Sequence, residues 1–362
     1  MHFNRAIFLL SGLHLLYFIG TYSVDLILRK YPTNKASDFK FRKYSEQVEE
    51  NRSSLNKVSE GDKKKTNTFS EINGLPNATR RLQVNSHKYE LLLNEPDVCR
   101  TISGKIEPIF LLVLMISSSE NFEQRIRQRK SCLSIQNVSG KRVKSVFLLG
   151  NPGNKTIKDL IYKESAKYHD ILMENFYDSY RNLTLKTIMG LKWASIYCPA
   201  AAYVMKTDDD VFINLTSAAT YFEEIPSKSV MSGFLWPNSK PYRVRTSKWY
   251  LSRKEYSKDR FPKYLSGMCY VLSGDLPRRL FEESLSVPYL FLEDVYIGLL
   301  SERLHVSKLH SSKFLIQKTA YNFCTFRDAI AVHLYHPALV DTYWEKQLKM
   351  SISNSTCSQE RK

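Results

Sequence analysis

Short, continuous apolar runs alternate along the chain with longer stretches of mixed polarity. The runs at Ile109–Ile116, 143–149 and 200–205 are rich in Val, Leu, Ile, Met and Ala, which is typical of strands buried on both faces. The stretches around them predict helices at residues 120–134, 157–169 and 183–195. Strands that alternate with helices predict an α/β fold, in which a mostly parallel sheet is covered by helices on both faces.

The second half of the chain continues with shorter elements. Residues 211–213 and 269–272 predict strands, residues 217–224 predict a helix, and Glu293 opens a further helix that is rich in Leu. The segment at residues 231–256 is both aromatic and basic. Its aromatic side chains could form a wall for a sugar beside cationic groups, or could pack in the core and at sheet edges.

The most apolar stretch lies near the N-terminus, at residues 6–20, and continues more weakly to Leu28. Residues 6–28 therefore approach the roughly 20 residues that a helix needs to cross a bilayer. We expect a signal-anchor transmembrane helix behind a cytoplasmic tail of residues 1–5, with a cleaved signal peptide as the alternative. Either one places the rest of the chain in the secretory lumen, as a flexible polar stem at residues 29–98, a folded catalytic domain at residues 99–350 and a tail at residues 351–362.

The formal net charge of +17 fits a nucleic acid, an anionic membrane surface or an anionic small molecule as partner. No zinc-finger spacing, glycine-rich phosphate loop or RNA-binding aromatic motif accompanies the charge, so a nucleic-acid partner would depend on charge alone. Six cysteines without a Cys-x-x-Cys pair favour disulfides over a zinc site, and their pairing stays open. Sequons for N-glycosylation, which fit a lumenal chain, occur at Asn51, Asn77, Asn137, Asn154, Asn182, Asn214 and Asn354.

Three consecutive carboxylates, Asp208, Asp209 and Asp210, follow the predicted strand at residues 200–205. Adjacent like charges repel each other unless a cation or solvent relieves them, and open α/β sheets bind ligands at the carboxyl ends of their strands. Carboxylate oxygens suit hard divalent ions such as Mg²⁺ and Mn²⁺, which commonly bridge a protein to phosphates. The run indicates a metal and diphosphate site, with a solvated acidic turn as the alternative.

A set of motifs in register resembles the β-1,3-glycosyltransferase family, which includes β-1,3-galactosyltransferases and β-1,3-N-acetylglucosaminyltransferases, with fringe as a more distant relative. Phe122, Arg125 and Arg129 resemble the family's opening motif, and the string VMKTDDDVFIN resembles its Asp-x-Asp region. The resemblance covers residues 108–344. Further matches are KWY at 248–250, YLSG at 264–267, YVLSGD at 270–275, EDVYIG at 293–298, Cys324, 333–337 and Trp344. Departures, which leave the disulfide pattern open, occur at Gln128, Cys132, Leu265, Cys269 and Leu299.

The resemblance implies a GT-A type (Rossmann-like) fold, a UDP-sugar donor, a divalent cation such as Mn²⁺ and inversion at the anomeric carbon. It implies Asp294 as the general base, for which a helix cap is the alternative role and Glu293 the alternative residue. Metal ligands would be Asp208, Asp210 and His333, although His333 could also be an ordinary packed histidine. Contacts to the UDP-sugar are expected from Arg125, Arg129, Lys206, Asp208, Asp209, Trp249, Gly267 and Glu293. For the arginines a solvated helix face is the alternative, and for Lys206 a structural ion pair.

We therefore expect a single-pass type II membrane protein of the Golgi that transfers a hexose, with galactose favoured, in β-1,3 linkage to a glycan on a glycoprotein or glycolipid. N-acetylglucosamine or N-acetylgalactosamine as the transferred sugar is the first alternative. A non-catalytic lumenal relative that binds glycans is the second. No nucleic-acid partner is expected.

Overall fold

A computed structural model describes residues 84–353 and Cys357. The predicted membrane segment at residues 6–28 lies outside the described residues, as does most of the predicted stem. Among the helices of the described part, none is both long enough and apolar enough to span a bilayer.

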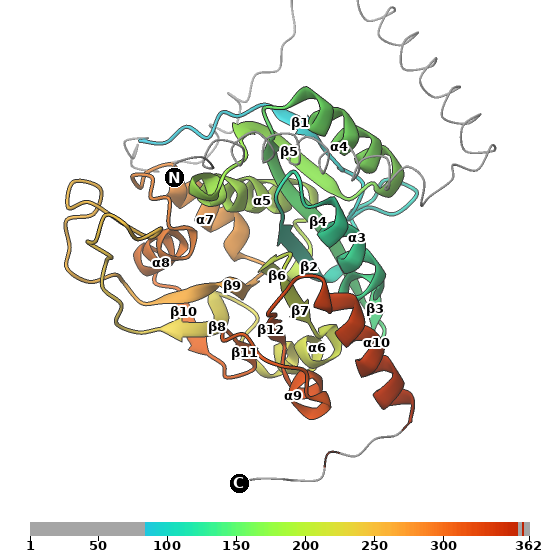
Figure 1. Cartoon of the computed structure of the whole chain (residues 1–362). Helices are drawn as coiled ribbons and strands as arrows, with labels where there is room; N and C mark the ends of the chain where they lie inside the picture. Colours follow the sequence, from blue (N-terminus) through green and yellow to red (C-terminus); the bar gives the residue numbers. More distant parts are fainter. Residues whose placement is uncertain (1–83, 354–356, 358–362) are drawn as a thin grey trace, which may run out of the picture. The chain divides into compact units, whose positions relative to one another are not determined.

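A twisted mixed sheet forms the centre of the domain (Figure 1). Four neighbouring strands, β5, β4, β2 and β6, run parallel; β9 is antiparallel to β6, and β8 and β10 return to the direction of β6. The sheet is therefore mixed: its centre is parallel, as predicted, and β1, β3 and β9 are its antiparallel members. Its strands, in spatial order, are β1 (Leu91–Leu93), β5 (Ile171–Tyr177), β4 (Lys141–Asn151), β2 (Ile109–Ile116), β6 (Ala201–Asp208), β9 (Tyr264–Ser273), β8 (Val230–Trp236) and β10 (Ser307–His310), with β3 (Asn137–Val138) paired to β4.

Helices cover both faces of this sheet, as the alternating pattern predicts (Figure 1). One face packs against α5 (Leu183–Tyr197), α7 (Leu276–Ser284) and α8 (Glu293–Arg303). The other packs against α3 (Phe122–Lys130), α4 (Lys155–Tyr168), α6 (Leu215–Glu224), α9 (Phe323–Asp328) and α10 (Leu339–Ile352). Two separate apolar clusters result, because the side chains of β2, β4 and β6 alternate between the two faces. Two 3₁₀ turns, η1 (Cys132–Ser134) and η2 (Tyr180–Asn182), complete these connections.

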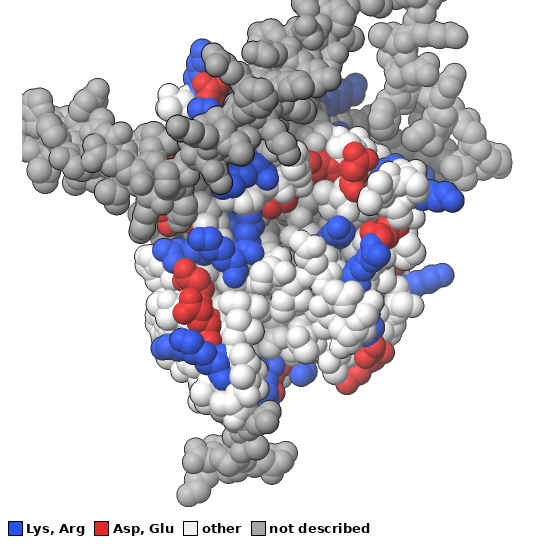
Figure 2. Space-filling view, turned by 90° about the vertical axis from the view of Figure 1, so that its right-hand side faces the viewer, with Lys and Arg blue, Asp and Glu red and all other residues white. Residues whose placement is uncertain are grey.

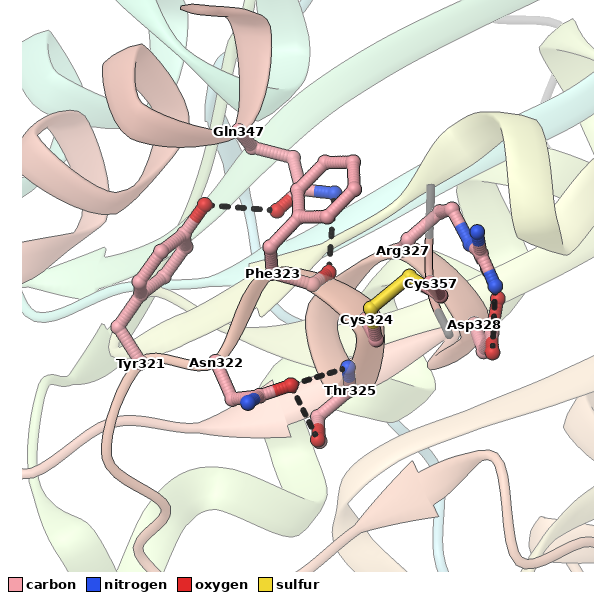
Figure 3. The surroundings of a disulfide bond; sticks show 9 residues. All are labelled: Tyr321, Asn322, Phe323, Cys324, Thr325, Arg327, Asp328, Gln347 and Cys357. Atoms are coloured by element: carbon pink, nitrogen blue, oxygen red, sulfur yellow. Dashed lines mark hydrogen bonds and ion pairs between the residues drawn. A yellow bond between two sulfur atoms is a disulfide. The ribbon is translucent and has the colours of Figure 1, made fainter. Parts of the chain in front are cut away.

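A small second sheet brings the C-terminal part of the chain to the end of β6. Its order is β11 (Phe314–Leu315), β12 (Ala331–His333) and β7 (Val211–Ile213), with β12 antiparallel to β7 and His333 opposite Val211. The disulfide Cys324–Cys357 ties α9 to the segment after α10 (Figure 3). Gln347 of α10 stands beside that disulfide, where it accepts a hydrogen bond from the Tyr321 hydroxyl at 3.1 Å.

A second disulfide, Cys99–Cys198, joins the entry segment to the end of α5. Strand β1, which precedes Cys99, already belongs to the central sheet, so ordered structure begins before the position at which the sequence predicts the folded domain. Cys132 and Cys269 are free and buried. Burial raises the pKa of both thiols to about 12, which keeps them protonated and unreactive at neutral pH.

Positive charge does not gather into a basic stripe on the face that Figure 2 shows. Lys and Arg side chains there alternate with Asp and Glu around a broad area without charged side chains (Figure 2). A nucleic-acid binder concentrates its basic residues on one face or along one helix. Among the described residues that remain visible on this face, the basic side chains are interleaved with acidic ones.

Candidate active site

Polar side chains collect where the parallel strands end. Strands β2, β5 and β6 are followed by Ser117, Asp178 and Asp209 respectively, and the carboxyl ends of parallel strands meet at one edge of a sheet. Strand β9 runs the opposite way, so its first residues, including Gly267, reach the same edge. The candidate site is this edge, together with the start of α8.

Lys206 connects the end of β6 to the start of α8. Its buried ammonium donates to the Asp208 carboxylate at 2.7 Å and to the Gly267 carbonyl, and lies 3.6 Å from a Glu293 oxygen. Burial by itself lowers the pKa of Lys206, but the neighbouring carboxylates outweigh burial and raise it, so the ammonium stays charged. The ion pair considered as an alternative for Lys206 is present, and it fixes Asp208 relative to the first turn of α8.

Asp208 is the least stabilised carboxylate of the acidic run. Desolvation raises its pKa to about 7, against the lowering effect of Lys206, and Asp210 adds to the rise through like charge. Its side chain is still 38% exposed, so a ligand can reach it. A cation placed beside Asp208 and Asp210 would relieve this repulsion.

The Asp209 side chain points into the protein, where it contacts the loop that follows β2. The buried carboxylate accepts hydrogen bonds from the Ser117 hydroxyl at 2.6 Å and from the Asn121 amide at 2.9 Å. Its backbone carbonyl accepts from the Gln128 amide at 3.0 Å. Both side-chain contacts engage Oδ2, and only 8% of the residue is exposed. The structure therefore gives Asp209 a structural position with little access for a UDP-sugar.

Asp210 and His333 form a pair across the small sheet. Nε2 of His333 lies 3.4 Å from Oδ2 of Asp210, while its Nδ1 lies 3.2 Å from the Ile316 carbonyl. Burial alone would raise the pKa of Asp210, but the hydrogen bond and charge of His333 outweigh burial and lower it. The same hydrogen bond raises the pKa of His333. Asp210 is thus paired with His333 and lies close enough to Asp208 for the two carboxylate charges to interact.

Asp294 lies in the first turn of α8 against the Gly267 backbone. A Cβ at Gly267 would stand 3.3 Å from the Asp294 Cβ and 3.3 Å from a Glu293 oxygen, so only glycine allows this approach without a shift. Burial and the nearby Glu293 charge raise the pKa of Asp294 to about 6, against backbone N–H groups of Val295 and Gly267 that lower it. The Asp294 carboxylate is the basic group of the site that has no side-chain partner among the described residues.

Glu293, by contrast, is fully engaged. One oxygen accepts from the Tyr270 hydroxyl at 2.6 Å and from the Thr187 hydroxyl at 3.0 Å, and the other faces Lys206. These partners hold the carboxylate within the protein, where it is 6% exposed. The geometry therefore favours Asp294 over Glu293 as a proton acceptor.

Arg125 and Arg129 are both committed to ion pairs within the protein. Arg125 is fully buried. Its Nη2 and Nε donate to the two carboxylate oxygens of Glu164 in α4 at 2.6 and 2.9 Å, and its Nη1 donates to the Ser118 carbonyl at 2.7 Å. Arg129 pairs with Asp170 at 2.7 Å and with Glu164, near the amino end of β5, away from the acidic run. The structure therefore gives no support to uridine or diphosphate contacts by these arginines, nor to a solvated helix face.

Trp249 belongs to an exposed aromatic group beside the carboxylates. Its indole N–H donates to the Tyr180 hydroxyl at 3.0 Å, its ring lies 5.1 Å from that of Tyr242, and the Lys248 ammonium stands 4.7 Å above it. Tyr180 is close enough to Asp294 and Asp208 for both charges to raise its pKa, although burial is the larger cause. This group can stack against a sugar ring next to the acidic site.

Two buried polar residues of the site were missed from the sequence. Lys186 of α5 donates to Asp178 at 2.7 Å and to the Ser117 carbonyl at 2.6 Å, with an exposure of 2%. Asp178 also accepts from the backbone N–H of Ser119 at 2.8 Å. The Ser-Ser-Ser run directly after the first strand could have indicated this loop, because strand ends carry ligand sites; the lysine lies inside an apolar helix and gives no such signal.

Among the described residues, no three His, Cys, Asp or Glu side chains converge into a cage that could hold a metal alone. The donor set nevertheless fits a hard divalent ion that takes its other ligands from phosphate and water, which is how Mg²⁺ is usually bound. Asp210 and His333 supply an adjacent carboxylate and imidazole. Asp208 supplies a second carboxylate, whose ionised form is disfavoured by burial and by the charges of Asp210 and Glu293.

Comparison with known proteins places the chain in a family. The sequence profile named Galactosyltransferase matches residues 123–312. Human beta-1,3-galactosyltransferase 1 is 34% identical over 78% of this chain and 83% of its own length. Beta-1,3-galactosyltransferase 5 of Pan paniscus is 39% identical over 66% of this chain and 80% of its own. A solved structure of the galactosyltransferase LgtC with donor and acceptor sugar analogs overlaps 69% of this chain and 98% of its own at 12% identity and a TM-score of 0.35.

The extent of these sequence matches defines the protein's class as a hexosyltransferase enzyme. The chain belongs to the galactosyltransferase family, as the motif resemblance predicts.

Proposed function

We propose that the protein transfers galactose from UDP-galactose to a hydroxyl of an acceptor glycan, in β-1,3 linkage and with inversion at the anomeric carbon. The observation that carries the proposal is Asp294, a carboxylate with raised pKa and no side-chain partner, tied through Gly267 and Lys206 to the acidic end of β6. The β-1,3-galactosyltransferases among the relatives support the choice of sugar and linkage.

Inversion by direct displacement requires a base on the acceptor side and stabilisation of the leaving diphosphate. Asp294 would take the proton of the attacking hydroxyl. A pKa of about 6 leaves this carboxylate mostly ionised at neutral pH and makes it a stronger base than an ordinary aspartate. Its place in the first turn of α8 fixes the direction from which the acceptor approaches.

The residues at the end of β6 would stabilise the leaving diphosphate. Asp210 and His333, with Asp208, would hold a divalent cation such as Mn²⁺. When bound there, the cation would neutralise the negative charge that grows on the departing UDP. Lys206 would keep Asp208 in place, and Trp249 with Tyr180 would stack against one of the sugars.

We also propose a single-pass type II location in the Golgi membrane, with residues 6–28 as anchor and the catalytic domain in the lumen. The apolar stretch and the sequons support this address. The two disulfides support an oxidising compartment. The acceptor would accordingly be a glycan on a glycoprotein or glycolipid.

A donor panel tests the function. The full chain, solubilised in detergent, is incubated with Mn²⁺, a terminal glycan acceptor and UDP-galactose, UDP-N-acetylglucosamine or UDP-N-acetylgalactosamine, and released UDP and product linkage are measured. We expect turnover with UDP-galactose and a β-1,3 product. Turnover with another donor alone would assign a different sugar, and no turnover with any donor and a range of acceptors would contradict the proposal.

A further inference from the structure

Four sequons lie within the described residues, and their asparagine side chains differ sharply in how they are bonded. These are Asn137, Asn154, Asn182 and Asn214. N-glycosylation replaces one hydrogen of the side-chain amide, so the amide nitrogen must face solvent and must be able to give up one donor. The carbonyl oxygen keeps its acceptor capacity after modification. Hydrogen bonding therefore separates sequons that tolerate a glycan in the folded protein from those that do not.

Asn154 meets both requirements. It is exposed at the start of α4, and its sequon partner Thr156 is exposed as well. Its carbonyl oxygen caps the helix by accepting from the Ile157 N–H at 3.1 Å, and its amide nitrogen donates to no group among the described residues. A glycan on Nδ2 would project into solvent while the helix cap remains intact.

Asn137 resembles Asn154 in this respect. It is exposed in the β3–β4 hairpin, and its carbonyl oxygen accepts from the Gly140 N–H at 2.9 Å. No hydrogen bond from its amide nitrogen exists within residues 84–353. Ser139, the third residue of this sequon, is exposed at the tip of the hairpin.

Asn214 is the opposite case. Its amide nitrogen donates to the Phe326 carbonyl at 3.1 Å and to the Arg327 carbonyl at 3.0 Å, so both hydrogens are used. Its carbonyl oxygen accepts from the Thr216 and Ser217 N–H groups at the start of α6. A glycan would remove one donor and place a sugar between α6 and α9, next to the small sheet that holds His333.

Asn182 is an intermediate case, which the hydrogen-bond criterion does not exclude, because only one of its two amide hydrogens has a partner among the described residues. Its amide nitrogen donates to the Tyr177 carbonyl at 2.7 Å. The threonine of its sequon, Thr184, is buried with 1% exposure and donates to the Leu290 carbonyl at 2.7 Å. A glycan here would stand beside Tyr180, at the aromatic group of the candidate site.

We infer that the folded protein carries N-linked glycans on Asn154 and Asn137 and none on Asn214. In the modification, the amide nitrogen loses one hydrogen as a proton and bonds to the anomeric carbon of an oligosaccharide. The carbon–oxygen bond to the lipid-linked pyrophosphate of the donor breaks. The inference needs the lumenal address proposed above and is independent of the transferase reaction.

Glycan mapping of the full chain, expressed in animal cells and purified as folded protein, tests this inference. Enzymatic release of N-glycans in heavy-oxygen water converts each occupied Asn to labelled Asp, which is read by mass spectrometry. We expect label at residues 154 and 137 and none at 214. Label at 214 in the folded protein, or no label at 154 or 137, would overturn the inference.

Paired variants provide the control. Asn154→Asp keeps a good helix-capping oxygen and should remove one glycan step in electrophoresis without lowering Tm. Asn214→Asp loses both donors and should lower Tm while leaving the glycan ladder unchanged. An unchanged ladder for Asn154→Asp, or a lost step for Asn214→Asp, would contradict the assignment. Because transfer activity is not the readout, a failed donor panel and a failed glycan map are distinguishable.

Discussion

Asp294 is the residue on which the proposed chemistry depends, because its neighbour Glu293 is engaged by Tyr270, Thr187 and Lys206. Asp294→Asn keeps the shape of the side chain and removes its basicity. We expect UDP and donor affinity to be retained, and kcat to fall by ~10²–10⁴, the usual contribution of a general base. Isothermal titration with UDP and Mn²⁺, beside initial rates, separates the two effects, and undiminished turnover would remove Asp294 as the base.

The raised pKa of Asp294 predicts a pH profile. The base must be ionised to act, so kcat/KM should fall as the pH drops through about 6, the pKa to which burial and Glu293 raise this carboxyl. At higher pH the rate should reach a plateau for this group. Initial rates at subsaturating donor and fixed Mn²⁺ test the profile, with donor affinity measured at each pH as the control. If kcat/KM instead fell around the ordinary aspartate pKa of about 4, the Asp294 carboxyl would be more exposed to solvent than the structure shows.

Asp210 should report on the cation. Asp210→Asn preserves the volume but weakens both its pairing with His333 and its affinity for a hard divalent ion. We expect the Mn²⁺ concentration that supports half-maximal rate to rise at least tenfold. Asp209→Asn is the matched control, because the Asp209 carboxylate faces Ser117 and Asn121; it should lower stability and leave the metal dependence unchanged. An equal metal dependence in the two variants would refute the assignment.

At the scale of single residues, the sequence indicated which residues form the site better than it indicated the directions in which their side chains point. The strand-end pattern indicated a ligand site at Asp208 and Asp210, whereas the roles of Gly267 and Asp294 were implied by the family resemblance. The sequence could not tell that the Asp209 carboxylate turns inward, because neighbouring residues in a run differ only in side-chain direction.

Among the elements, α3 and α4 are joined by a buried ion pair between Arg125 and Glu164. Arg125→Met would leave Glu164 with Arg129 as its remaining partner. Breaking a buried pair in this way typically costs about 3–5 kcal/mol, and because Glu164 retains one partner we expect the low end of that range in urea unfolding. UDP affinity per folded molecule should not change. A loss of UDP affinity without a loss of stability would instead support the donor contact that the family motif implies.

The long apolar strands and the helices between them were predictable, because the continuous apolar runs of β2, β4 and β6 alternate with longer stretches of mixed polarity that contain α4 and α5. Strand β5 was missed, since Glu174 and Asn175 interrupt its apolar run. Helix α7 was missed too, although Pro277 at its start marks a helix N-terminus. The short strands β8, β10 and β12 depend on pairing with distant segments, which no local pattern encodes.

For the whole molecule, two disulfides close loops of very different size. Cys99–Cys198 spans 99 residues and Cys324–Cys357 spans 33. The chain-entropy model assigns about 4.7 kcal/mol to a loop of roughly 100 residues and less to a shorter one. We expect the double variant Cys99→Ser/Cys198→Ser to lose more stability in urea unfolding than Cys324→Ser/Cys357→Ser. The reverse order would show that native contacts at the C-terminus, and not loop length, determine how much stability each disulfide contributes.

The pairing of β12 with β7 places His333 opposite Val211 and beside Asp210. The imidazole is therefore contributed by a segment encoded more than a hundred codons after the acidic run. A premature stop codon shortly before position 333 would yield a protein with its aspartates but without this imidazole, and β12, the central strand of the small sheet, would be incomplete. Late truncations of the reading frame are accordingly expected to behave as loss-of-function alleles, as severe as those that interrupt the middle of the coding region.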